Sequence, residues 1–465
     1  MSKTIAEVAK NIWDYAEIRF KEHKSAEELA RYAEAAGFTV ERGAGGLETA
    51  IKASYGSGHP VIAILGEYDS LAGLSQKEDV PRKEKGPQEM NGHGCGHHLL
   101  GAGSLLAAQY VKEHLEKSGK PGTVIFYGCP GEEGGSGKAW MIKNGEFKDV
   151  DVAITWHPFA DNGIYYMSTL ANYQAAFRFE GKGSHAAGSP HLGRSALDAV
   201  ELMDVGCNYL REHIIPEARL HYAITNTGGI SPNVVQPEAE VLYLVRAPKL
   251  SQVDEIFERV CNVARGAALM TGTTVKLLFE KGTSEYRSNR ELEKQLYKNM
   301  LKFDDATYND EELKYLQSFK DTLSESEIES EYGWMAEPAG ERWDEFKAMI
   351  RDSAAFRGVL PYDPARSRLQ PGSTDVGDVS KIIPTGQIRV ACYAIGSPGH
   401  SWQIVAQGKS SVAIKGMEYA ARVMGQTAVD ILEDPELLAR IRAEFEKTRE
   451  PYVSPMKYGK DPIAL

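Results

Sequence analysis

The chain has 465 residues, of which 42% are apolar and 25% are charged. This length exceeds the size at which a single hydrophobic core usually keeps growing, so we expect two structural units. The 65 acidic residues outnumber the 53 basic ones and give a net charge of −12, which argues against nucleic acid or an anionic membrane as the main partner.

The sequence predicts a cytoplasmic protein. Its first residues, MSKTIAEVAK, are charged throughout and lack the apolar segment of a secretory signal, and no later apolar run is long enough to span a bilayer. Five cysteines, an odd number spread over a long chain, do not form a disulfide framework. A reducing compartment would keep these thiols free.

The first third of the chain alternates helix-type and strand-type patterns. Ser25 to Glu28 fits a capping box that opens an amphipathic helix, which we expect to end near Gly37. Apolar strands are predicted at 61–65, 124–127 and 152–155, and each runs directly into polar residues. In open α/β sheets, ligand-binding groups gather at the carboxyl ends of the strands, so this pattern predicts an α/β domain with its site at that edge.

A second pattern covers residues 172–285 and predicts an inserted domain. Strand-type alternation and helical periodicity follow each other in the order βαββαβ, which is that of a ferredoxin-like sandwich. The six elements are expected near 175–179, 192–210, 221–226, 240–246, 253–267 and 275–279. The next segment, 290–356, is charged and helical in type.

Five residues have side chains that bind metals: Cys95, His97, Glu133, His157 and His400. One thiolate, three imidazoles and a carboxylate suit a divalent transition metal, and the set is large enough for two ions. Each residue also has a plainer explanation, such as a structural turn for the glycine-rich motif around Cys95 or a surface position for His400. In the same motif, His93 and His98 are assigned supporting or surface roles.

Glu132 and Glu133 are adjacent carboxylates at a predicted strand end. Like charges repel, and a solvated loop is their usual explanation. A metal changes this, because one carboxylate can bind the ion while its neighbour takes a proton from the bound water. The following glycines resemble a phosphate-binding loop, but Ala139 replaces the hydroxyl residue needed after Lys138, so we reject a nucleotide site. Glu67 and Asp69 form a further acidic pair at a predicted strand end, and Asp69 could orient a metal-bound imidazole.

Seven motifs then show a family resemblance: GEYDSLAGL, NGHGCGHH, PGEEGGSGK, TWHP, GKGSHAAGSPHLGRSALDA, NTGGISPNVV and SPGHSW. Their order resembles the aminoacylase and glutamate-carboxypeptidase superfamily of metallopeptidases, and the Cys-Gly-His motif resembles its amidohydrolase branch. The similarity runs from about residue 10 to 425. It is highly specific for the superfamily and less specific for the substrate.

The resemblance implies a metallopeptidase-type α/β/α catalytic domain, built from residues 1–171 and 286–465, around a lid and dimerisation domain at 172–285. It implies two divalent ions, Mn²⁺ or Zn²⁺, held by the five metal-binding residues, with Glu132 as general base. His185 would stabilise the oxyanion, often in the active site of a partner subunit. Better-known superfamily members have a metal-binding His where this chain has Glu67, so we expect Glu67 to lie outside the ligand set.

The expected activity is hydrolysis of an N-acyl or N-aroyl amino acid, with p-aminobenzoyl-glutamate as the leading substrate. By resemblance, Arg246 would receive the substrate carboxylate and Asn233 would lie beside the substrate, although Arg246 also fits a surface ion pair and Asn233 a turn. One alternative is a dipeptidase or general aminoacylase of the same fold. Another is a non-catalytic partner subunit, since hydrolases of this branch can be assembled from two related chains. A homodimer through the lid is expected, with a related second subunit as an alternative.

Overall fold

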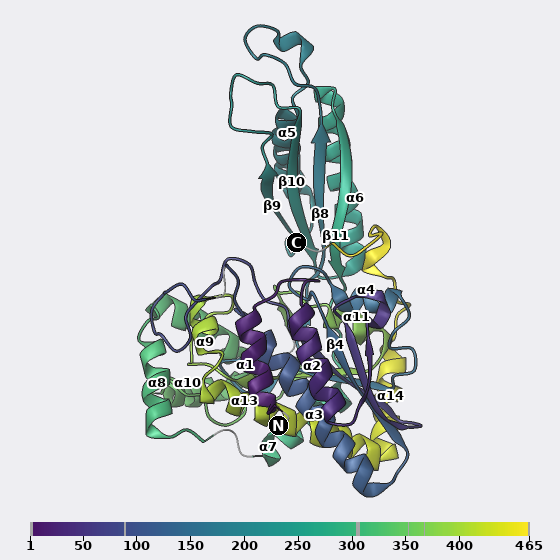
Figure 1. Ribbon diagram of the computed structural model, residues 1–465, viewed down its shortest axis with the longest axis vertical. Helices are drawn as coiled ribbons and strands as arrows, with labels where there is room; N and C mark the ends of the chain where they lie inside the picture. Colours follow the sequence, from purple (N-terminus) through teal and green to yellow (C-terminus); the bar gives the residue numbers. More distant parts are fainter. Residues whose placement is uncertain (1–2, 88–89, 304–306, 352, 367, 464–465) are drawn as a thin grey trace.

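The computed structural model describes residues 3–87, 90–303, 307–351, 353–366 and 368–463. It consists of a broad α/β body and a narrow arm, which we define as residues 171–283, projecting from one side of the body (Figure 1). None of the helices in these ranges is both long enough and apolar enough to cross a membrane.

A seven-stranded mixed sheet forms the centre of the body. Its strand order is β1-β2-β4-β3-β5-β13-β6, and β4, β3, β5 and β13 run parallel to one another. The bounds are β1 Thr39–Arg42, β2 Ile51–Ser57, β3 Val61–Glu67, β4 Gly122–Cys129, β5 Val152–Phe159, β6 Gly163–Ile164 and β13 Thr385–Ala391. The three strands predicted from the sequence are β3, β4 and β5, and their carboxyl ends meet at one edge.

Helices cover both faces of this sheet. Alternate residues such as Ile62 and Ile64 belong to one core with the long helices, while Ala63 and Leu65 belong to another with two short helices. The long helices are α1 Ile5–Tyr15, α2 His23–Ala35, α3 His97–Ser118, α7 Arg290–Lys302, α13 Ser411–Glu433 and α14 Pro435–Thr448, and the short ones are α4 Gly137–Lys143 and α11 Val376–Ile382. The body is therefore an α/β/α sandwich, as expected.

The arm is a four-stranded antiparallel sheet with two helices. Its elements follow the order βαββαβ and its strands lie in the order β11-β8-β10-β9, which is a ferredoxin-like arrangement. The bounds are β8 Ala171–Glu180, α5 Ala196–Leu210, β9 Arg219–Asn226, β10 Glu238–Ala247, α6 Leu250–Thr271 and β11 Thr274–Thr283. The chain enters and leaves the arm at neighbouring points beside the body, because Asn172 pairs with Thr283.

The charged segment after α7 forms α8 Asp310–Lys320, α9 Glu325–Ala339 and α10 Trp343–Arg351; residues 304–306 and 352 of it lie outside the described ranges. Buried residues of α8 to α10 pack against the chain that follows β13 and against α12 Trp402–Gln407. A short two-stranded sheet of β7 Ser168–Thr169 and β12 Leu369–Gln370 completes the fold.

The capping box predicted at Ser25 is wrong. Helix α2 begins two residues earlier, and its first residue follows Glu22, whose side chain makes no capping bond. The amide and hydroxyl of Ser25 both donate to Glu17, outside the helix, and Glu28 accepts from Lys3 and Asn11. Both residues of the predicted box therefore bind neighbouring segments, and neither caps the helix.

Candidate metal centre

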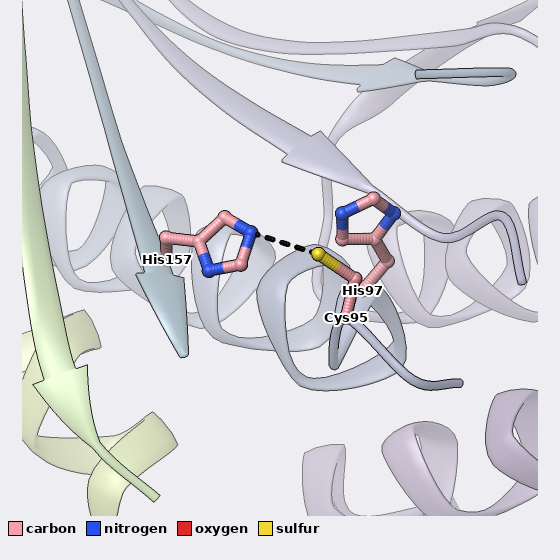
Figure 2. Close-up of side chains that lie close together, drawn as sticks. All are labelled: Cys95, His97 and His157. Atoms are coloured by element: carbon pink, nitrogen blue, oxygen red, sulfur yellow. Dashed lines mark hydrogen bonds between the residues drawn. The ribbon is translucent and has the colours of Figure 1, made fainter. Parts of the chain in front are cut away.

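Cys95, His97 and His157 form the first candidate metal group. One ligand atom from each lies within 4.8 Å of the others, and Cys95 Sγ is 3.3 Å from His157 Nε2 (Figure 2). His157 lies near the end of β5, whereas Cys95 and His97 flank the start of α3. Asp69 Oδ1 lies 2.9 Å from His97 Nδ1, which directs His97 Nε2 toward the group. That Asp69 orients a metal-bound imidazole stays a prediction.

Gly96 makes this turn possible. Its φ is 78°, in the left-handed region that favours glycine, and a Cβ at this position would lie 2.2 Å from the hydroxyl oxygen of Tyr393. Only glycine satisfies both constraints without displacing Tyr393. The Cys-Gly-His motif therefore holds Cys95 and His97, its two candidate ligands, at the first turn of α3.

Cys95, Glu133 and His400 form a second group with the same 4.8 Å limit. His400 Nε2 lies 3.7 Å from Glu133 Oε2, and the His400 amide donates to the carbonyl of Gly94 at 2.9 Å. His400 has a φ of 56°, an uncommon conformation for a residue with a side chain, which is often found at functional sites. Because Cys95 belongs to both groups, two ions could share its sulfur.

Glu67, His97 and Glu132 form the third group. Glu67 Oε2 lies 3.2 Å from His97 Nε2, while Glu67 Oε1 accepts from Lys138 at 2.5 Å. Glu67 is thus buried beside the expected ligands and paired with a lysine. Glu132 lies in the same group and lines the cavity that opens above it.

The electrostatics of the site suit a bound cation. Burial, together with nearby carboxylates, raises the pKa of both Glu132 and Glu133, and burial raises the pKa of the Cys95 thiol. Burial and the nearby His97 lower the pKa of His157 to about 4, which leaves its imidazole neutral. Among the described residues, the buried Glu133 Oε1 has no hydrogen-bond partner, and the contact of 3.2 Å between His97 Nε2 and Glu67 Oε2 does not have hydrogen-bond geometry. The donor set, its excess of carboxylates and these unpaired atoms fit divalent metal ions.

A cavity of about 340 Å³ lies above these residues, between the body and the base of the arm. One set of lining residues is apolar or aromatic and includes Pro158, Phe159, Tyr165, Tyr393 and Ile404. A polar set includes Asn172, Arg246, Lys281, Thr283 and Ser373. Arg246 donates to Ser373 Oγ at 3.1 Å, which holds its guanidinium group at the cavity wall. None of the described lining residues comes from the 290–356 segment.

His185 and Asn233 lie away from this cavity. The registers of β8 with β10 and β11 place Asn172 and Arg246 at the base of the arm and Glu180 and Glu238 at its far end. The loops that carry His185 and Asn233 follow that far end and contact each other, since His185 pairs with Val234. Eight residues of strand span about 26 Å, so the two predicted residues do not reach the cavity of their own chain.

Sequence reasoning missed the buried pair Lys138 and Asp375. Lys138 Nζ donates to Glu67 and, at 2.7 Å, to Asp375 Oδ1, and all three side chains are buried. The two residues are 237 positions apart in sequence, and the only local signal was the lysine of an incomplete phosphate-loop pattern.

The surface alternative for His93 and His98 is wrong. Both are fully buried, with His93 Nε2 bonded to the Ile12 carbonyl and His98 Nε2 bonded to the Gly408 carbonyl. Burial lowers the pKa of His98 to about 3, so it is neutral and joins α3 to the C-terminal segment. Neither residue belongs to a candidate metal group among the described residues.

Known proteins resemble this chain over most of its length. The model of peptidase family M20/M25/M40 matches residues 63–430. The chain is 49% identical to one of the subunits of p-aminobenzoyl-glutamate hydrolase from Escherichia coli (strain K12), over 99% of this chain and 96% of that protein. It is 27% identical to the Xaa-Arg dipeptidase of Mus musculus, over 96% and 89%.

Solved structures share the fold. An aminobenzoyl-glutamate utilization protein from Klebsiella pneumoniae superposes with a TM-score of 0.59 at 14% identity, covering 92% of this chain and 95% of that one. A dinuclear metal-binding peptidase of the M20 family from Bacillus subtilis gives a TM-score of 0.55 at 15% identity, covering 92% and 98%. With the family match extending over most of the sequence, the chain belongs to peptidase family M20/M25/M40 and is a hydrolase of that family.

Proposed function

We propose that this hydrolase is a metal-dependent amidohydrolase that cleaves N-acyl or N-aroyl amino acids, with p-aminobenzoyl-glutamate as its substrate. The observation that carries the proposal is that two candidate metal groups share Cys95 and lie under a cavity with one aromatic wall and one cationic wall. An aminobenzoyl ring suits the aromatic wall, and a carboxylate suits Arg246. The 49% identical E. coli protein is named for this substrate.

In this proposal Cys95, His97, Glu133, His157 and His400 hold two ions, either Mn²⁺ or Zn²⁺. When bound, the ions would polarise the amide carbonyl and lower the pKa of a bound water. Glu132 stays off the ligand set, accepts the water proton and returns it to the departing nitrogen. Burial and the carboxylates of Glu67 and Asp375 raise the pKa of Glu132, which favours its acceptance of a proton.

A second copy of the chain would supply His185 and Asn233. Strand β9 is an edge strand with exposed Tyr222 and Ile224, and α5 beside it exposes Val205 and Tyr209. Exposed apolar residues along an unpaired edge favour association through the arm. We therefore propose a homodimer in which residues 172–285 act as lid and dimerisation domain between catalytic parts 1–171 and 286–465. The five unpaired cysteines support a cytoplasmic location.

Release of p-aminobenzoate by the purified single chain tests the proposal. Protein stripped of metal should be inactive and should recover activity with Mn²⁺ or Zn²⁺. Glu132→Gln should lower kcat by about 10²- to 10⁴-fold while two ions stay bound, because a general base contributes about this much. The exposed Glu41→Gln serves as the matched control and should leave kcat unchanged.

The outcomes separate the alternatives. No release with either ion, but hydrolysis of other acyl amino acids or dipeptides, would favour a general aminoacylase or dipeptidase. Activity only after addition of a related second chain would favour a hetero-oligomer; a Haemophilus influenzae homolog of the other kind of p-aminobenzoyl-glutamate hydrolase subunit is 25% identical over 48% of this chain. Unchanged turnover by Glu132→Gln would exclude it as the base.

A further inference from the structure

A β-bulge in β11 determines where Lys281 points. Phe279 pairs with Ala175 on β8, but Lys281 pairs with Gln174, so Glu280 is an extra residue between them. Regular alternation would send Lys281 to the same side as Phe279, whose ring packs against Tyr173. The bulge instead turns Lys281 to the opposite face of the sheet, where it lines the catalytic cavity.

Lys281 has N–H donors available for a bound molecule at this position. Its ammonium group donates one hydrogen bond to the Glu133 carbonyl oxygen at 2.9 Å. An ammonium group carries three N–H donors, and among the described residues Lys281 Nζ makes this one hydrogen bond. The carbonyl contact fixes the side chain at the cavity wall, and the remaining donors are available to a bound molecule.

Arg246 provides a second cation in the same cavity. It lies on β10, on the other side of β8 from β11, so about two strand spacings, roughly 10 Å, separate the two backbones. Asn172 lies between them, is fully buried, and has no hydrogen-bond partner for its side-chain oxygen among the described residues. Arg246 Nε is likewise unpartnered and buried. This wall of the cavity therefore contains buried polar atoms whose hydrogen-bonding capacity a ligand would satisfy.

The position of Glu132 indicates which part of a substrate would meet these cations. Both Arg246 and Lys281 interact electrostatically with Glu132. A base that returns a proton to the departing amide nitrogen must lie beside that nitrogen. In a departing glutamate, the α-carboxylate carbon is two bonds from the nitrogen and the side-chain carboxylate carbon is four bonds away. Both carboxylates would thus lie near Glu132 and within reach of the two cations.

We propose that Lys281 binds the side-chain carboxylate of the departing amino acid while Arg246 holds its α-carboxylate, so that the enzyme selects substrates with an acidic amino acid. This inference rests on the proposed amidohydrolase function and adds its specificity. Two cations on one wall also disfavour a basic departing residue, because like charges in a partly buried site repel each other.

The test compares kcat/KM for p-aminobenzoyl-glutamate and p-aminobenzoyl-glutamine with the metal-loaded enzyme. The two conjugates have the same shape, but the second lacks the side-chain charge. The wild type should prefer the glutamate conjugate by about 10- to 100-fold, since a hydrogen bond to a charged group contributes about this much. Lys281→Met should lower the ratio of kcat/KM for the glutamate conjugate to kcat/KM for the glutamine conjugate by about 10- to 100-fold, and Lys281→Arg should restore part of it.

Lys276→Met is the matched control, because Lys276 lies on the same strand but is exposed and paired with Glu180. It should leave the preference unchanged. Equal loss on both conjugates in Lys281→Met, or a wild type that cleaves both equally well, would overturn the role of Lys281 while leaving the amidohydrolase intact. No release from either conjugate by the wild type would overturn the proposed function, and this assignment with it.

Discussion

Replacement of Lys138 by methionine should destabilise the protein strongly. Lys138 lies in the first turn of α4, and its fully buried ammonium group lies 2.5 Å from Glu67 Oε1 and 2.7 Å from Asp375 Oδ1. Methionine keeps most of the apolar side chain and removes the charge. Two buried carboxylates would then lie close together without their cation.

The structure sets the size of the effect. At these separations an effective permittivity of about 20 gives roughly 6 kcal/mol of attraction for each pair. Part of this offsets the cost of burying the charges, and removal of one partner of a buried ion pair costs about 3–5 kcal/mol. We expect this loss in the free energy of unfolding at pH 7.5. It should be smaller at pH 5.5, because without the lysine the pKa values of Glu67 and Asp375 rise and protonation relieves the repulsion.

Urea unfolding of metal-free protein, followed by tryptophan fluorescence at both pH values, measures the loss. The exposed Lys148→Met serves as control and should change stability by less than about 0.5 kcal/mol. Asp375→Asn should cost less in the Lys138→Met background than in the wild type, because the two residues are coupled. A Lys138→Met variant within 1 kcal/mol of the wild type, or an equal loss at both pH values, would refute this reasoning.

Three further predictions concern the site and the adjoining helix. Cys95→Ser should lower the metal content from two ions per chain to one or none, as measured by elemental mass spectrometry, because two of the three candidate groups use its sulfur. Two retained ions would contradict a shared ligand. Gly96→Ala should lower Tm far more than Gly73→Ala, since both have φ near 79° but only Gly96 would place a Cβ against Tyr393; equal shifts would mean that the contact relaxes freely. Burial lowers the pKa of His98 to about 3, below its value of 6.5 in the unfolded chain, so the unfolded chain takes up a proton first as the pH falls. His98 should therefore lower the free energy of unfolding by about 1.4 kcal/mol per pH unit between pH 6.5 and pH 3. His98→Gln should make the pH dependence of the free energy of unfolding shallower by one proton, and an unchanged slope would show that His98 is charged in the fold.

The sequence predicts the α/β fold well because its signals are local. The strands β3, β4 and β5 are continuous apolar runs, and each is followed within a few residues by the polar groups that meet at the sheet edge. The fold class and the family are confirmed. The metal-ligand roles of Cys95 and its neighbours remain predictions, although the structure brings all five side chains together.

Features that depend on distant partners were not predictable. Lys138 meets Asp375 only when α4 and α11 pack on the same face of the sheet. The orientation of Lys281 depends on a bulge that shifts the register by one residue, which composition does not encode. The capping box at Ser25 failed for a related reason, since a carboxylate eight residues earlier binds the serine.

Strand β13 has a consequence for incomplete chains. It lies between β5 and β6 and forms a parallel ladder with β5, yet it is made from residues 385–391, more than 200 positions after β5 ends. A nascent or proteolysed chain that stops before it would contain Cys95, Glu133 and His157 but would leave the backbone of β5 unpaired on that side. Exposed strand edges pair with other chains, so such a fragment should aggregate rather than persist as a weakened enzyme. In the cell, this protein should therefore occur as the complete chain or as insoluble fragments.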